Sequence, residues 1–174
     1  DLPVAADLEN GFGDAPEDFL KPPDANAYTK LLKAAYPAVK AGNPDAEVVV
    51  GGPQHVNTQW TEKVYKAGAR NYFDVMSVHP YMSNRPPEDA DDGTAYKMAH
   101  TKALINLMKS YSDGNKPIWY TEFGWSVHKD SSSTPNWARG VSEAQQADYL
   151  VRSMASVTAN FPQVRKLYWY TAWD

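Results

Sequence analysis

A glutamate at the end of an apolar run is the residue of this chain best suited to chemistry. Glu122 follows the run 116–121, with Tyr120 before it and Trp125 after it. A carboxylate beside aromatic rings suits glycoside hydrolysis, in which one carboxylate attacks the anomeric carbon and a second protonates the leaving oxygen. The pattern favours Glu122 as a nucleophile, while a carboxylate that pairs with Arg139 or caps a turn fits the same letters equally well.

The apolar residues along the chain alternate between two spacings. Helical spacing predicts four helices, at 24–42, 57–69, 96–108 and 142–160. Short apolar runs predict five strands, at 2–6, 47–50, 73–81, 116–125 and 164–174. Asp24, Asn57 and the capping box Ser142–Gln145 mark helix starts, and Pro37 predicts a kink or break. The alternation predicts one α/β domain, residues 1–174, with parallel strands and right-handed crossovers.

Polar and aromatic residues just past each apolar run form the candidate site, because ligands of parallel α/β folds collect beyond the carboxyl ends of the strands. These residues are Asp7, Glu9, Asn10, Gln54, His55, His79, Tyr81, Glu122, Trp125, His128, Trp173 and Asp174. A histidine at such a place also fits a buried hydrogen-bond network, which is the alternative for His79. Trp119 and Trp169 alternate within strands and are interpreted as core residues, and Trp137 is a loop residue without an assigned role.

Composition argues against several classes of partner. The 17 basic and 21 acidic residues give a formal net charge of −4, which offers no footprint for nucleic acid or an anionic membrane. The chain has no cysteine and no apolar run of the ~18–20 residues that span a membrane. No metal or other cofactor is predicted, and the acidic loop 88–93 fits a solvated loop better than a calcium site. We expect a soluble, secreted or extracellular protein, although cysteine usage leaves the compartment open.

Most of the chain resembles the later part of a clan A glycoside hydrolase barrel. Segments 73–81, 118–125 and 168–174 resemble its sixth to eighth strands, and 28–37 and 48–53 resemble the fourth helix and fifth strand of a family 39-like or family 5-like member. The likeness covers about residues 24–174, and the turn Thr-Glu-Phe-Gly-Trp at 121–125 is its strongest element. The resemblance implies a retaining β-glycosidase that acts on plant or microbial β-linked sugars by double displacement.

The resemblance also implies roles for individual residues. Glu122 is the expected nucleophile, His79 and Tyr81 orient it or the sugar, and Trp173 stacks on the sugar. From their places after the strands we also expect Trp125, His128 and Asn10 in substrate binding. The clan's acid/base lies in an Asn-Glu-Pro pattern, whereas this chain has Asp-Leu-Glu-Asn at 7–10, so Glu9 is the expected acid/base without the usual neighbours.

The chain is short for a complete barrel. A full barrel has eight strands and about 250 residues, and 174 residues with five predicted strands correspond to half to five-eighths of one. Because a parallel sheet does not leave its edges and inner face open to water, we expect a homodimer that completes or covers it. Residues 1–17 resemble the isocitrate lyase and phosphoenolpyruvate mutase superfamily instead. Two alternatives therefore stay open: a carbohydrate-binding remnant that uses Trp125, Trp173 and Tyr81, or a magnesium-dependent lyase.

Overall fold

All strand pairs in the described part of the chain are parallel. The structure is a computed structural model that describes Val4–Ala5 and residues 24–170. The strands are β1 (Val4–Ala5), β2 (Val48–Val49), β3 (Met76–Val78), β4 (Ile118–Phe123) and β5 (Val164–Trp169). β1 pairs with β2, and β3, β4 and β5 form a three-stranded sheet in that order. A parallel bridge between Val49 and Val75 joins the two sheets. The predicted parallel strands are confirmed, and they lie side by side in chain order.

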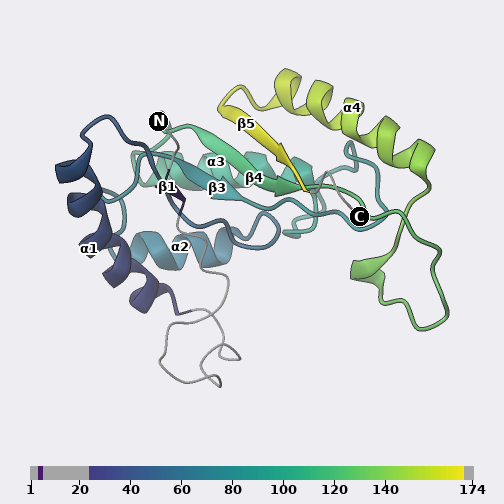
Figure 1. Ribbon diagram of the computed structural model, residues 1–174, viewed down its shortest axis with the longest axis horizontal. Coiled ribbons are helices and arrows are strands. Elements are labelled where there is room, and N and C mark those ends of the chain that lie inside the picture. The colour runs from purple at the N-terminus through teal and green to yellow at the C-terminus, as the bar shows by residue number, and fades with distance from the viewer. Residues whose placement is uncertain (1–3, 6–23, 171–174) are drawn as a thin grey trace.

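Helices separate the strands along the chain and lie around the sheet (Figure 1). The helices are α1 (Ala25–Gly42), α2 (Thr58–Lys66), α3 (Thr101–Ser110) and α4 (Glu143–Asn160), with 3-10 turns η2 (Met98–His100) and η3 (Asn136–Ala138). α1 contacts α2 and α2 contacts α3, while α4 contacts β5, the strand at the edge of the three-stranded sheet. Within the described residues, no helix is long and apolar enough to cross a membrane.

The predicted helix caps are confirmed. The Asp24 side chain accepts a hydrogen bond from the Asn26 N–H at 2.8 Å, and Asn57 accepts one from the Trp60 N–H at 3.0 Å. Ser142 and the residue three positions later form the reciprocal capping box. Caps depend on neighbours within one turn, so a local sequence pattern is enough to predict them.

Several predicted boundaries are wrong. α1 continues through Pro37 without a break, because a single missing N–H is outweighed by the packing of its buried face, which includes Tyr28 and Leu32. Tyr96 was expected on the apolar face of the third helix, but the helical segment begins at Met98 and the Tyr96 ring is exposed. The strands are also shorter than predicted: β4 covers 118–123 of the predicted 116–125, and Glu122 is the last residue but one of this strand.

The two faces of β4 pack into different clusters. Ile118 and Tyr120 belong to the main core, which the buried faces of the helices complete. Trp119, one residue out of phase, packs with Val49 and Val75 in a separate small cluster. This alternation is the two-residue period of a strand that is covered on both faces. The interpretation of Trp119 as a core residue is confirmed.

One edge of the three-stranded sheet is open within the described residues. β5 pairs only with β4, and Arg165, Lys166 and Tyr168 on this strand are exposed. On α4, Val151 and Met154 are also exposed. The homodimer expected from the short chain stays a prediction, and light scattering on the purified protein tests it.

Candidate active site

Glu122 lies close to the carboxyl end of β4, where the strand pairing is irregular. The register with β5 shifts between Tyr120 and Phe123, so the two residues between them leave the regular alternation. Such irregularities re-aim side chains and are common beside active sites. Phe123 is fully buried, whereas the Glu122 side chain keeps 27% of its surface exposed. The backbone therefore points a carboxylate outward at the end of an otherwise buried strand.

Two side chains from the turn after β3 lie beside the same oxygen of Glu122, and one of them is hydrogen-bonded to it. The Tyr81 hydroxyl donates a hydrogen bond to Oε2 at 2.7 Å. The Nδ1 atom of His79 lies 3.7 Å from Oε2. Within residues 24–170, Oε1 has no hydrogen-bond partner. The alternative that pairs Glu122 with Arg139 is wrong, because the Arg139 guanidinium lies beside Asp130 instead, with Nε 4.0 Å from Oδ2.

His79 is held tightly by the turn after β2. It is 1% exposed, its N–H donates to the Pro53 carbonyl at 3.1 Å, and its carbonyl accepts from the His55 N–H at 2.7 Å. A Cβ on Gly52 would lie 2.7 Å from His79 Nε2, so only glycine leaves room for the ring. His79 is therefore a buried, hydrogen-bonded histidine and also a neighbour of Glu122. Both interpretations of this residue from the sequence, the buried hydrogen-bond network and the place beside Glu122, fit the structure.

Tyr81 is oriented through its own backbone. Its N–H donates to the His79 carbonyl at 2.8 Å, and its carbonyl accepts a hydrogen bond from His55 Nδ1 at 2.9 Å. His55 adopts the left-handed backbone conformation with φ of 59°, which is uncommon for a non-glycine residue. Burial lowers the pKa of the His55 ring, which favours the neutral form in which Nδ1 carries its proton. His55 is thus a positioning residue, and its place after a predicted strand was the only sequence signal for it.

A cleft of about 310 Å³ opens beside this group. Its lining comes from the turns after β2, β3 and β4 and from η3: Gln54, His55, Tyr81, Ser83, Gly124, Trp125, Ser126, His128, Trp137, Ala138 and Arg139. The cleft thus lies at the carboxyl ends of parallel strands, where the sequence rule places ligands. Predicted residues Tyr81, Trp125 and His128 all reach it, and Glu122 is joined to it through Tyr81.

Trp125 lies at the cleft but is mostly buried. It is 4% exposed, its ring packs edge-on against Phe123 and Tyr149, and Trp169 lies 6.2 Å away between ring centroids. Its indole N–H donates to the Arg85 carbonyl at 2.9 Å. Trp125 therefore connects the loop after β3 to the core, and little of its surface is left to line the cleft.

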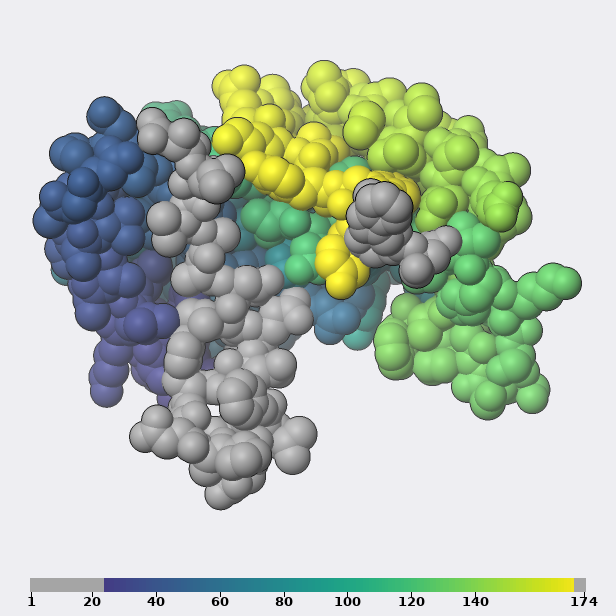
Figure 2. Space-filling model, viewed as in Figure 1, coloured from purple at the N-terminus to yellow at the C-terminus, as the bar shows by residue number. Residues whose placement is uncertain are grey.

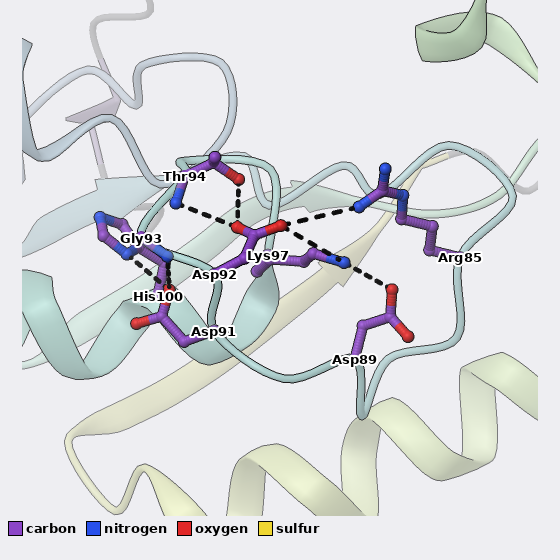
Figure 3. Close-up of polar contacts among 8 residues, drawn as sticks. All are labelled: Arg85, Asp89, Asp91, Asp92, Gly93, Thr94, Lys97 and His100. Carbon is purple, nitrogen blue, oxygen red and sulfur yellow. Dashed lines mark hydrogen bonds and ion pairs between the residues drawn. The ribbon is translucent and has the colours of Figure 1, made fainter.

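The loop after β3 is cross-linked by its own charges (Figure 3). The ammonium of Lys97, a buried residue, lies 2.6 Å from Asp89 Oδ2 and 3.9 Å from Asp92 Oδ2. Arg85 also reaches Asp92, at 3.9 Å, and Asp92 accepts hydrogen bonds from Thr94. The loop is exposed at residues 88 and 90–93, in line with the predicted solvated loop, and the sequence did not indicate that the buried Lys97 pairs with its carboxylates.

The neighbouring carboxylate, Asp91, accepts a hydrogen bond from His100 Nδ1 at 3.0 Å, which fixes the other end of the same loop to η2 (Figure 3). Within the described residues, no group of three or more histidine or acidic side chains is arranged to hold a metal ion. The loop that carries His79, Tyr81 and Arg85 is thus stabilised by internal ion pairs.

Five residues of the predicted candidate site lie outside the described residues: Asp7, Glu9, Asn10, Trp173 and Asp174. The roles expected for Glu9 as acid/base, Asn10 as substrate ligand and Trp173 as stacking ring stay predictions. His128 is described, half-exposed, with Nε2 3.5 Å from Asp130 Oδ1. The residue that sequence reasoning left without a role is Trp137, which lines the cleft although its position in a loop gives no periodic signal.

A parallel α/β fold with a strand-end glutamate, a tyrosine hydrogen-bonded to it and an adjoining cleft is the arrangement of barrel-type glycosidases. The comparisons with known proteins agree. Residues 20–173 match the family described as glycosyl hydrolase catalytic core, and the chain belongs to that family. No curated protein sequence matches it.

Solved structures with a similar fold are glycoside hydrolases. A family 39 glycoside hydrolase from Bacteroides cellulosilyticus WH2 has a TM-score of 0.67 and 26% identity, over 84% of this chain and 30% of that one. An α-L-arabinofuranosidase of family 51 from Thermotoga petrophila has a TM-score of 0.60 at 12% identity, over 92% and 33%. A fungal β-1,4-galactanase has 0.56 at 20%, over 86% and 46%. The chain spans less than half the length of these relatives.

Proposed function

We propose that this chain supplies the nucleophile side of a retaining β-glycosidase site, with Glu122 as the attacking carboxylate. The observation that supports this most directly is the 2.7 Å hydrogen bond from the Tyr81 hydroxyl to Oε2, with His79 Nδ1 3.7 Å from the same atom. Both side chains lie beside Oε2, so that Oε1 is the oxygen proposed to react. A nucleophile has to be oriented and yet keep one lone pair available.

The proposed reaction has two steps. Glu122 Oε1 attacks the anomeric carbon and forms an ester to the sugar, while the leaving oxygen takes a proton from a second carboxyl group. Water then attacks the same carbon, the ester bond breaks, and the second group removes the proton from that water. Glu9 is proposed as this second group. The substrate is proposed to be a glycoside, an oligosaccharide or a polysaccharide with β-linked sugars.

Family membership over residues 20–173 favours this proposal over a magnesium-dependent lyase. The carbohydrate-binding remnant has no observation of its own in its favour, and the hydrogen bond from Tyr81 to Glu122 supports the proposed nucleophile instead.

The test is hydrolysis of a panel of dinitrophenyl β-glycosides. This leaving group needs little help from an acid, so the assay reports on the nucleophile alone. We expect release by the unchanged chain and none above background by Glu122→Gln. Comparison with poorer leaving groups then tests Glu9 through kcat/KM, which reports on the first step: Glu9→Gln should lower kcat/KM for poor leaving groups and leave it nearly unchanged for dinitrophenyl, while kcat falls for all substrates because the second step needs the base. Equal release by Glu122→Gln would overturn the assignment of the nucleophile, and binding of β-linked sugars without any turnover would support the remnant.

A further inference from the structure

The segment between β4 and α4 forms a lobe beside the cleft. Val127 and Val141 form a parallel bridge at its base, and the Gly140 N–H donates to Asp130 Oδ1 at 2.8 Å across it. Figure 2 shows the lobe in green at the lower right, set off from the rest of the surface by a notch. Its short helix η3 lies on the side that faces the sheet (Figure 1).

The lobe is attached to the loop that carries Tyr81. Ser83 Oγ donates to the Asn136 carbonyl at 2.5 Å and accepts from the Arg139 N–H at 3.2 Å. These two bonds lie on either side of Trp137 in the chain. The backbone that carries the indole is therefore held against the same turn that orients the proposed nucleophile.

Trp137 is 70% exposed, more than any other large apolar side chain in the described part of the chain. An indole this exposed loses the stabilisation that burial of its large apolar area would give. It is also not randomly placed, since it lines the same cleft as Tyr81 and Gly124. An exposed, backbone-anchored aromatic ring at the rim of a cleft is typical of a ligand contact rather than of packing.

The chemistry of the cleft points to a sugar as the ligand of this ring. The apolar face of a pyranose stacks on an aromatic plane, and its hydroxyl groups need polar partners around the edge. Gln54, His128 and Arg139 line the same cleft and supply such groups. The volume of about 310 Å³ lies at the lower end of the ~300–1,000 Å³ of ligand pockets.

We propose that Trp137 is the stacking platform of a second sugar subsite, next to the one at which Glu122 acts, so the substrate is a β-linked chain of two or more sugars. This inference rests on the proposed function. It identifies the substrate class, and it assigns binding rather than chemistry to Trp137.

The experiment compares short and long substrates with the full chain. Dinitrophenyl β-glycosides of one to four sugars are used, in the gluco, xylo or galacto series whose monosaccharide is hydrolysed fastest. A parallel set of unlabelled β-linked oligosaccharides extends the chain on the other side of the scissile bond. We expect Trp137→Ala to lower kcat/KM about 10- to 100-fold for the longer substrates of one set, mainly through KM. The monosaccharide should change less than about twofold.

Two variants serve as controls. Trp137→Phe keeps a stacking face and should retain most of the kcat/KM for long substrates. Val151→Ala removes a comparably exposed apolar side chain from α4, outside the cleft, and should leave all substrates unchanged.

The outcomes separate this inference from the proposed function. Hydrolysis that depends on Glu122 but is equally fast in Trp137→Ala for every chain length would overturn the subsite alone. If no substrate of any chain length is hydrolysed, the proposed function fails, and calorimetric titration with unlabelled β-linked tetrasaccharides decides the subsite. Binding that weakens at least about tenfold in Trp137→Ala then supports it, and equal binding or none overturns it.

Discussion

Carboxylates at the two ends of the parallel strands have different surroundings. At the amino end, Asp74 precedes β3 and is surrounded by donors: the Val48 N–H at 2.8 Å, Lys40 Nζ at 2.9 Å and the Tyr36 hydroxyl at 3.0 Å. Burial raises the pKa of Asp74, but these donors outweigh it and hold the pKa below its usual range. This carboxylate joins α1, β2 and β3.

Asp113, before β4, shows the same arrangement. It is buried, with Lys116 Nζ 3.1 Å from one oxygen and Arg70 Nε 3.4 Å from the other. Burial lowers the pKa of Lys116, and the hydrogen bond and charge of Asp113 offset part of this decrease. Each oxygen of this carboxylate therefore lies beside a basic side chain of the same protein.

At the carboxyl end, Glu122 has both of its described neighbours on one oxygen and lies next to a cleft. The same chemical group thus stabilises the fold at one end of the sheet, and at the other end we propose that it reacts. In barrel folds this division is general, because the loops after the strands form the site and the opposite face stabilises the fold. The number and placement of donors around a carboxylate separate the two roles here.

The sharpest test of this contrast is Glu122→Gln. The amide is nearly isosteric but is not a nucleophile, so we expect kcat to fall by at least about 10³-fold, equivalent to about 4 kcal/mol in the barrier. Thermal unfolding should stay within about 0.5 kcal/mol of the unchanged chain, because the side chain is partly exposed. Assays on dinitrophenyl glycosides together with melting curves measure both. A large loss of stability would place Glu122 among the structural carboxylates.

The corresponding test at the amino end of the strands is Asp113→Asn. It leaves Lys116 and Arg70 without their counter-charge, and we expect the free energy of unfolding to fall by about 2–4 kcal/mol. Urea titration measures it, and kcat of the folded protein should be unchanged. Asp148→Asn is the control, since this exposed partner of Arg152 should change stability by less than about 1 kcal/mol. Equal effects of the two variants would contradict a structural role for the buried carboxylate.

Tyr81→Phe removes only the hydroxyl that holds Glu122. Loss of a hydrogen bond to a charged group corresponds to about 1.5–3 kcal/mol, so we expect kcat/KM to fall about 10- to 100-fold. Tyr36→Phe removes the hydroxyl bound to Asp74 and should reduce stability without slowing hydrolysis. Steady-state rates and unfolding curves for the pair distinguish the two ends of the strands. If Tyr36→Phe slowed hydrolysis as much as Tyr81→Phe, the two ends of the strands would not differ in their effect on the reaction.

Asp74→Asn should have the smallest effect, with a pH signature. The folded-state pKa is lowered, so the contribution of Asp74 is fully present above the ordinary pKa of about 3.8 and is lost as the pH falls through the folded-state value. At pH 7 we expect a loss of about 1 kcal/mol in unfolding free energy. Below about pH 4 the difference between Asp74→Asn and the unsubstituted protein should start to shrink, and it should vanish only below the lowered folded-state pKa. Unfolding measured from pH 7 to pH 3 tests this, and a constant difference would contradict it.

Local patterns were sufficient to predict the helices and their caps. Asp24, Asn57 and Ser142 act within one turn of their own helix, so the letters around them carry the information. The period-two pattern of β4 likewise places Trp119 on the opposite face of the strand from Ile118 and Tyr120, and both faces are buried. The position of Glu122 near a strand end followed from the same apolar run, although the irregular pairing with β5 placed it inside the strand.

The sequence by itself thus determined the alternating α/β fold, the identity of the carboxylate and the histidine and tyrosine near it. Only the tertiary structure decided how they are used. The contact between Tyr81 and Glu122 spans 41 positions, and the bonds from Ser83 that hold Trp137 at the cleft span 53 and 56. Such contacts arise when separate βα units pack together, and no periodicity within a short window records them.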